Sequence, residues 1–153
     1  MSREIELVPA REEDLEELTE ICVRAFHTDI ECGAPGVGGP PGYDNVDFQR
    51  RVLERSEEYL TIVVDGRMAG GFLVFKTAET EYYMCQLFLD PPYYRQGVGT
   101  RSMDLMLERY PDASIWRTDT PAWNTRTTPF YEKLGFTVYK EEDGLLHFEK
   151  RMD

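Results

Sequence analysis

The residues that most constrain the fold lie near the middle of the chain, at positions 81–110. Residues 84–89 are a short, mostly apolar run of strand length. Pro91 and Pro92 follow this run, and a residue without a backbone N–H ends a sheet ladder. Beyond them, apolar side chains recur at the helical spacing i, i+3, i+4 and i+7; these are Met103, Met106, Leu107 and Tyr110. The stretch therefore predicts a strand, a tight turn and a long amphipathic helix.

The turn between this strand and helix has the features of an anion site. Gly97 and Gly99 let the backbone approach a bulky group closely. The first N–H groups of the following helix have no partner within the helix, and they attract phosphate at the positive end of its dipole. Arg95 adds a fixed positive charge. The alternative is a strand–helix connection that needs glycine only for its bend, because short glycine patterns often arise by chance.

Local signals indicate further elements on both sides of this stretch. Asp65-Gly66 and Asp143-Gly144 are two-residue hairpin signals, and Gly70-Gly71 indicates a bulge or a close backbone approach. Gly135 is expected to end a short helix in the left-handed conformation. We expect strands at residues 5–8, 60–64, 68–77, 82–89, 113–117, 136–142 and 145–151, and a loop at 119–123. Helices are expected to begin at Glu12, to span 47–58 with Phe48 and Val52 inward, and to end at Tyr110 and Leu134.

Two segments resemble the GCN5-related N-acetyltransferase (GNAT) family. Residues 94–99, YRQGVG, resemble the signature Q/R-x-x-G-x-G/A, with Tyr94 where Gln or Arg is usual. Residues 124–136, NTRTTPFYEKLGF, are similar to the family's N-x-x-A-x-x-F-Y-E-K-L-G-F, with Thr127 in place of Ala. The two segments occur in the family's order and at about its spacing. The resemblance extends over residues 4–150 and is weakest at 27–52.

The resemblance implies a fold and a domain organisation. We expect one GNAT acetyltransferase domain over residues 1–153, of the α/β (α+β) class. Its mixed, mostly antiparallel sheet would have six to seven strands, flanked by about four helices, with a splayed central strand pair. Residues 33–43, rich in glycine and proline, are too long for an ordinary connector. In the resembled fold this segment helps to wall the acceptor site, so we interpret it as a substrate-side loop.

Acetyl-CoA is the implied co-substrate. The glycine turn would take its pyrophosphate, and the strand before the turn would offer backbone groups to its pantetheine arm. Asn124 resembles the residue that contacts this arm, with a helix cap or an Asx turn as its alternative role. The implied cofactor-binding residues are Leu87, Phe88, Leu89, Arg95, Gln96, Gly97, Val98, Gly99, Thr100 and Asn124.

Direct attack of an amine on the thioester in a ternary complex is the implied reaction. Tyr131 occupies the position of the family's general acid, although it could instead pack with Phe130 and Phe136 in the core. An alkyl ammonium has a pKa near 10, so the acceptor must lose a proton. Glu81, Asp119, His27, Asp29 and a water chain are all open as the base. Cys85 has no base beside it in sequence, so an acyl-cysteine route is not expected.

The composition of the chain limits the classes of molecule that it is expected to bind. The chain has 153 residues, 41% of them hydrophobic, and a formal net charge of −12 with a pI near 4.6. Its acidity argues against nucleic acid and favours a cationic small molecule or peptide amine, although acidic residues also serve solubility. Three separated cysteines and a charged N-terminus favour the cytosol, with no membrane segment. No metal is expected, because His27, Asp29, Glu31 and Cys32 match no ligand pattern.

Alternatives to this function stay open. A non-catalytic module could use the same turn to sense acyl-CoA, which the Tyr94 departure permits. The donor could be succinyl- or propionyl-CoA. Apolar strands at the end of the chain are compatible with a homodimer, and the sequence does not identify the acceptor.

Overall fold

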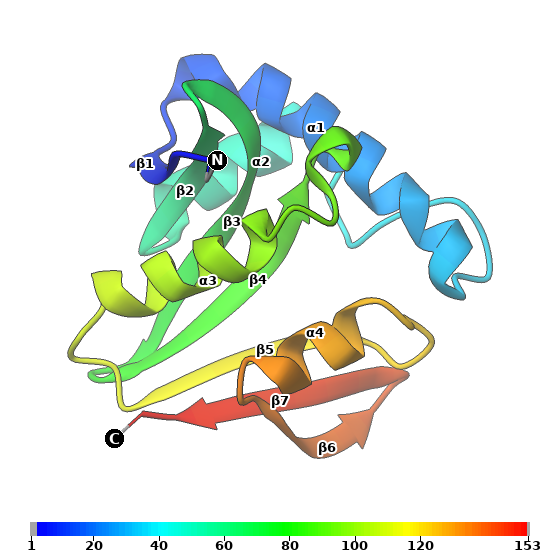
Figure 1. Ribbon diagram of the computed structural model, residues 1–153, viewed down its shortest axis with the longest axis vertical. Helices are drawn as coiled ribbons and strands as arrows, with labels where there is room; N and C mark the ends of the chain where they lie inside the picture. Colours follow the sequence, from blue (N-terminus) through cyan, green and yellow to red (C-terminus); the bar gives the residue numbers. More distant parts are fainter. Residues whose placement is uncertain (1–2, 153) are drawn as a thin grey trace.

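The computed structural model describes residues 3–152 and contains a seven-stranded sheet with helices on both faces (Figure 1). The strand order is β1-β2-β3-β4-β5-β7-β6, and among these strands only β4 and β5 pair in parallel. The strands are β1 (Ile5–Pro9), β2 (Glu58–Val64), β3 (Arg67–Ala78), β4 (Glu81–Leu89), β5 (Ile115–Pro121), β6 (Thr137–Glu142) and β7 (Leu145–Arg151). The helices are α1 (Leu15–His27), α2 (Val46–Arg55), α3 (Val98–Arg109) and α4 (Thr127–Lys133), with short 3-10 turns η1 (Glu12–Asp14), η2 (Thr28–Cys32) and η3 (Pro91–Tyr93).

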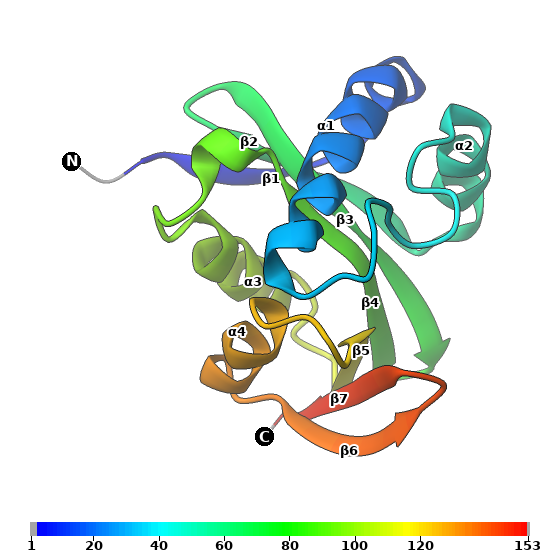
Figure 2. The same cartoon turned by 90° about the vertical axis from the view of Figure 1, so that its right-hand side faces the viewer.

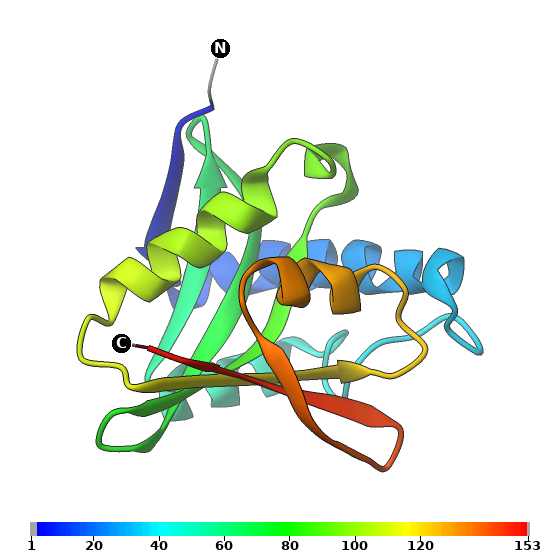
Figure 3. The ribbon, with the colours of Figure 1, turned by 60° about the horizontal axis from the view of Figure 1, so that its bottom comes forward.

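The sheet separates two apolar layers. Figure 3 shows α3 and α4 in front of the strands and α1 behind them. Because side chains alternate along a strand, Leu60 and Ile62 of β2 pack with Met103 of α3, whereas Tyr59 packs with Leu18 of α1. This alternation determines which strand residues face the α3 layer and which face the α1 layer.

The central strands β4 and β5 part after three residue pairs. The last pair is Tyr83 with Arg117, beyond which β4 runs on to Leu89 without a backbone partner on β5. The strand β5 instead stays paired with β7 as far as Pro121, which lies opposite Leu145. Figure 1 shows β4 and β5 diverging from their common end. The splayed pair predicted from the sequence is therefore confirmed, together with the predicted fold.

A bulge interrupts β4 inside its unpaired half. Gln86 has a φ of 53°, and residues 86–87 of β4 lie opposite Phe72 alone on β3. Nearby, a Cβ at Gly70 would overlap the Phe88 carbonyl oxygen, so the two strands approach too closely for a side chain there. The close approach predicted at Gly70-Gly71 is confirmed.

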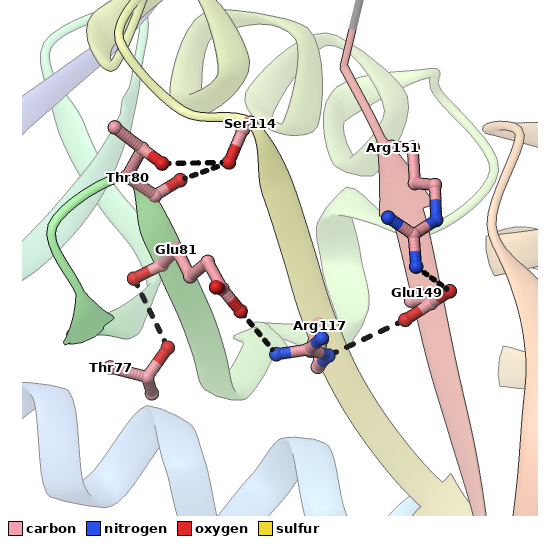
Figure 4. A network of polar contacts seen from close by, with 7 residues as sticks. All are labelled: Thr77, Thr80, Glu81, Ser114, Arg117, Glu149 and Arg151. Atoms are coloured by element: carbon pink, nitrogen blue, oxygen red, sulfur yellow. Dashed lines mark hydrogen bonds and ion pairs between the residues drawn. The ribbon is translucent and has the colours of Figure 1, made fainter.

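Charged side chains join the strands at the end of the sheet where β4 and β5 are still paired (Figure 4). Arg117 Nη1 lies 2.7 Å from Glu81 Oε1, and Arg117 Nε lies 3.5 Å from Glu149 Oε2. Arg151 extends the row, with Nη2 3.3 Å from Glu149 Oε1. Each partly exposed pair contributes at most about 1 kcal/mol. Together they connect β4, β5 and β7 just before β4 and β5 part.

Three expectations were wrong in detail. The predicted strand 113–117 begins later and the predicted loop 119–123 is strand as far as Pro121, because pairing with β7 outweighs the turn-like residues at 119–121. Thr28–Cys32, which directly precedes the expected irregular segment 33–43, forms a 3-10 turn. The predicted helix 47–58 spans Val46–Arg55; Val52 packs against the α1 layer as expected, and Gln49 is the fully buried residue of the helix. No helix within residues 3–152 combines the length and apolarity needed to cross a membrane.

Candidate active site

The turn before α3 presents free backbone N–H groups. Arg95 has a φ of 61° and Gly97 a φ of 76°, an alternation of backbone handedness that points successive N–H groups to one side. Within the part of the chain that the structure describes, the N–H groups of residues 95–100 donate to no protein acceptor. No atom lies within 4 Å of a Cβ placed at Gly97, so the turn is open on that side. Free N–H groups at a helix N-terminus are suited to an anion.

Gly99 serves packing as well as the turn. A Cβ there would lie 3.3 Å from Phe130 Cε1 and 3.7 Å from Leu89 Cδ1. The absence of a side chain therefore lets the start of α3 approach α4 and the end of β4. Val98 beside it is buried, whereas Arg95, Gln96, Gly97 and Thr100 are exposed.

The second half of β4, which has no partner on β5, leads to this turn. Leu87 and Leu89 are half-buried and pack on the α3 side, whereas Phe88 is buried against α1, its ring 6.5 Å from that of Phe26. The carbonyl of Met84 accepts a hydrogen bond of 3.0 Å from Thr118 Oγ1 of β5. The β4 edge beyond Met84 has no backbone partner on β5. Any cofactor role of residues 87–89 would thus use main-chain groups along this edge.

Tyr131 of α4 packs in the core, and its hydroxyl lies near the residues where β4 and β5 part. Its ring centroid lies 5.3 Å from that of Phe130, 5.7 Å from that of Phe136 and 5.5 Å from that of Phe148. Burial raises the pKa of its phenol, Asp119 and Cys85 raise it further, and hydrogen bonding with Thr118 lowers it. The hydroxyl therefore stays protonated at neutral pH and is near residues of both parted strands.

Asp119 is the candidate base that lies where the strands part. It follows the last β4–β5 pair by two residues, and its Oδ2 accepts a hydrogen bond of 2.6 Å from the Tyr83 hydroxyl of β4. His147 of β7 lies opposite it in the ladder, with Nδ1 3.9 Å from Asp119 Oδ2. Sequence analysis missed Tyr83 and His147, because only the strand register brings them to Asp119.

The other three candidate bases have different surroundings. Glu81 is paired with Arg117 at the closed end. His27 Nε2 lies 2.8 Å from the Tyr43 hydroxyl. Burial raises the pKa of Asp29, while Arg126 and the Asn124 amide lower it. None of these three side chains lies beside the unpaired edge of β4 and also contacts both β4 and β7, as Asp119 does.

Asn124 and Tyr94 tie neighbouring segments together. Asn124 is buried, and its Oδ1 accepts from the N–H groups of Arg126 at 3.0 Å and Thr127 at 3.1 Å, so it caps α4. The Tyr94 ring lies 4.9 Å from the Arg126 guanidinium, and its hydroxyl lies 3.3 Å from Thr28 Oγ1. Figure 2 shows the end of α1 close to the segment before α4, where Thr125 N also donates to the Cys32 carbonyl. Tyr94 thus joins the turn to η2, which follows α1, and to the residue before α4.

Cys85 of β4 lies close to Asp119 in this region. Burial raises the pKa of Cys85 to about 11, with Asp119 adding to the effect, so its thiolate is scarce at neutral pH. Among residues 3–152, no group of three or more His, Cys, Asp or Glu side chains is arranged to hold a metal ion. Trp116 belongs to the core, and Trp123 lies against Gly33.

The chain belongs to the acetyltransferase (GNAT) family, whose sequence model matches residues 16–136. This confirms the family expected from residues 94–99 and 124–136. Membership of this family supports acetyl transfer as the general class of activity. A relative from Bacillus subtilis, the uncharacterized protein YrkN, is 31% identical over 147 residues, which cover 92% of this chain and 79% of the relative.

Solved structures share the fold at low sequence identity. The PaiA N-acetyltransferase of Thermoplasma acidophilum in complex with coenzyme A has a TM-score of 0.81 and 18% identity, over 97% of this chain and 99% of that chain. The ribosomal-protein-S18-alanine N-acetyltransferase of Escherichia coli has a TM-score of 0.74 and 18% identity, over 98% and 95%. At these identities the likeness shows the fold alone.

Proposed function

We propose that this protein, as a single domain over residues 1–153, transfers an acetyl group from acetyl-CoA to a primary amine of a small molecule or peptide. The observation that carries the proposal is the open edge of β4, which leads directly into the free N–H groups of residues 95–100. A diphosphate suits those N–H groups, and an extended arm suits an unpaired strand edge. In this proposal, residues 87–89, residues 95–100 and Asn124 bind the coenzyme.

The remaining residues divide the proton transfers between them. Acetyl-CoA supplies the acyl group as a thioester. Asp119 accepts the proton of the acceptor ammonium, directly or through one water, and the neutral nitrogen then attacks the carbonyl carbon. The new C–N bond forms, the nitrogen releases its second proton to water, the C–S bond breaks, and Tyr131 donates its phenolic proton to the departing sulfur. Proton exchange with water then restores both side chains.

The position of Asp119 supports its role as the base. The Tyr83 hydroxyl donates a hydrogen bond to the carboxylate and His147 lies 3.9 Å from it, so the carboxylate is oriented where β4 and β5 part. Tyr131 is on α4, and both Asp119 and Cys85 act on its phenol. Base and acid therefore come from separate elements that border the same opening, as a direct transfer requires.

The activity is tested by mixing the purified protein with acetyl-CoA and a panel of amines, and by following the release of free thiol. The panel should contain diamines, aromatic amines and peptides with a free α-amine. Parallel reactions with propionyl- and succinyl-CoA identify the preferred donor. Thiol release that depends on one amine supports the proposal. Its absence with every amine, despite tight binding of acetyl-CoA, would favour the sensing module.

That second function is favoured by one observation. Tyr94 replaces the usual Gln or Arg, and its contacts with Thr28 and Arg126 join the elements around the turn. A module that only senses acyl-CoA needs the turn but not Tyr131. Replacing Tyr131 by Phe discriminates, because an enzyme loses turnover and keeps its affinity for acetyl-CoA.

The net charge of −12 favours a cationic acceptor through long-range attraction. The cytosol is the compartment that we propose, since Cys22, Cys32 and Cys85 are all free thiols. A homodimer stays a prediction.

A further inference from the structure

A fully buried glutamine lies between the sheet and the loop that precedes α2. Gln49 of α2 has no exposed surface. Its Nε2 donates to the Gly42 carbonyl at 3.2 Å and to Gln86 Oε1 at 3.3 Å, and its Oε1 accepts from the Tyr59 hydroxyl at 2.8 Å. Both of its N–H donors are used, so the orientation of the amide is fixed. A buried polar side chain this well satisfied specifies one arrangement of its neighbours.

The next residue in this chain of hydrogen bonds belongs to the bulge of β4. Gln86 accepts from Gln49 and donates from Nε2 to the Pro41 carbonyl at 3.3 Å. Its backbone is left-handed, which is uncommon for a residue other than glycine and costs conformational energy. One side chain therefore binds both α2 and the loop, from the unpaired half of β4.

The loop segment 40–43 has further contacts of its own. The N–H of Tyr43 donates to the Pro40 carbonyl at 3.1 Å, and the Tyr43 hydroxyl lies 2.8 Å from His27 Nε2. The side chains of Phe88 and Cys85 belong to the same layer as α1 and Tyr43. Segment 40–43 thus overlies β4 on the α1 side of the sheet, opposite the side on which α3 packs.

We propose that Gln49 and Gln86 are positioning residues that fix segment 40–43 to the bulge of β4, so that the segment forms a rigid wall of the acceptor site. The inference rests on the proposed function, because segment 40–43 is bound to Gln86 in the half of β4 that has no partner on β5, where the proposal places the thioester. Through the Gln86 side chain, α2 and segment 40–43 are joined to the bulge of β4. The acceptor therefore meets a preformed surface, which reduces the ordering cost of binding it.

The variant Gln86→Gly tests this role, because glycine adopts the left-handed backbone freely and only the side-chain contacts are lost. Removing two neutral hydrogen bonds predicts an acceptor KM raised about 5- to 20-fold. We expect kcat and the Kd for acetyl-CoA to stay within about twofold, which a general loss of structure would not produce. Putrescine and a short peptide with a free α-amine serve as probe acceptors. Thr137→Ala on β6, which removes a 3.4 Å hydrogen bond to the Glu149 carbonyl of β7, is the matched control.

Hydrogen–deuterium exchange of the amides of Tyr43 and Asn45 provides a readout that needs no turnover. Faster exchange of these two amides in Gln86→Gly, with unchanged exchange in α3, supports the proposed attachment of segment 40–43 to the bulge (the tether). Unchanged exchange, or an acceptor KM equal to that of the wild type, overturns it. Absence of turnover by the wild type would count against the proposed function and the acceptor role together. The exchange experiment would still report whether the tether itself exists, so the two failures are distinguishable.

Discussion

The Tyr83 hydroxyl of β4 donates a 2.6 Å hydrogen bond to Asp119 of β5, across the point at which the two strands separate. Tyr83 is the last residue of β4 to pair with β5, and Asp119 lies two residues beyond its own last pair. The bond therefore lies where the backbone pairing of β4 and β5 ends. It leaves the carboxylate beside the part of β4 that has no partner on β5. This placement leads to the first prediction.

Asp119→Asn should lower kcat about 100-fold or more while leaving the Kd for acetyl-CoA unchanged, because asparagine keeps the Tyr83 contact but accepts no proton. The deficit should shrink as the pH rises toward about 10, where about half of the amine is already neutral. The measurement is kcat for wild type and variant between pH 7 and pH 10. Glu81→Gln, which removes a carboxylate from the closed end, is the control and should stay within about twofold of the wild type. Equal deficits at every pH would argue that Asp119 is not the proton acceptor.

Tyr131→Phe should lower turnover at least about tenfold, since the departing sulfur loses its proton donor. The ring contacts with Phe130, Phe136 and Phe148 survive in phenylalanine, so the fold should be retained. Steady-state kinetics together with thermal unfolding checks both parts. A variant as active as the wild type would mean that Tyr131 serves only packing.

Cys85→Ala should retain acetyl transfer, because a buried thiol with a pKa of about 11 is a poor nucleophile at neutral pH. Trapping after mixing with radiolabelled acetyl-CoA should find no label on Cys85. Loss of turnover together with labelled Cys85 in the wild type would instead establish a covalent route.

The same thiol makes stability depend on pH. Burial raises the folded-state pKa of Cys85 from 9.0 to about 11, so its stabilising contribution is complete below pH 9 and is lost as the pH rises toward 11. The free energy of unfolding of the wild type should therefore fall relative to that of Cys85→Ala by about 1–3 kcal/mol over this range. Urea titrations at pH 8, 9.5 and 11 measure the difference, and a constant difference would contradict the assignment.

Local sequence signals predicted the parts of the fold that depend on single residues. Asp65-Gly66 and Asp143-Gly144 do adopt positive φ between hairpin strands, and Gly135 does so after α4. The glycine turn and the amphipathic helix after it were also predicted, because the conformational freedom of glycine and the helical spacing of apolar residues depend only on residues close together in sequence.

Features that depend on long-range pairing were not predictable in the same way. Residues 119–121 look like a turn, yet β7 holds them as strand, and the register alone places His147 opposite Asp119. Gln49 appears as an ordinary polar helix residue until the bulge at Gln86 supplies its partner. The choice among four candidate bases likewise required knowing where β4 and β5 separate.

The central claim is that the free N–H groups of residues 95–100 bind the diphosphate of acetyl-CoA. Thr100 is exposed and is the third residue of α3, where an N–H has no helical acceptor. Proline there removes one N–H at little cost to the helix, whereas alanine keeps it. The two variants therefore form a matched pair.

Calorimetric titration of acetyl-CoA into the wild type, Thr100→Ala and Thr100→Pro tests the claim most directly. We predict one site per chain, an unchanged Kd in Thr100→Ala, and a Kd raised about 10- to 100-fold in Thr100→Pro, as expected for losing one hydrogen bond to a charged group. Circular dichroism should show the same helix content in all three proteins. No binding by the wild type, or equal affinity in Thr100→Pro, would contradict the account.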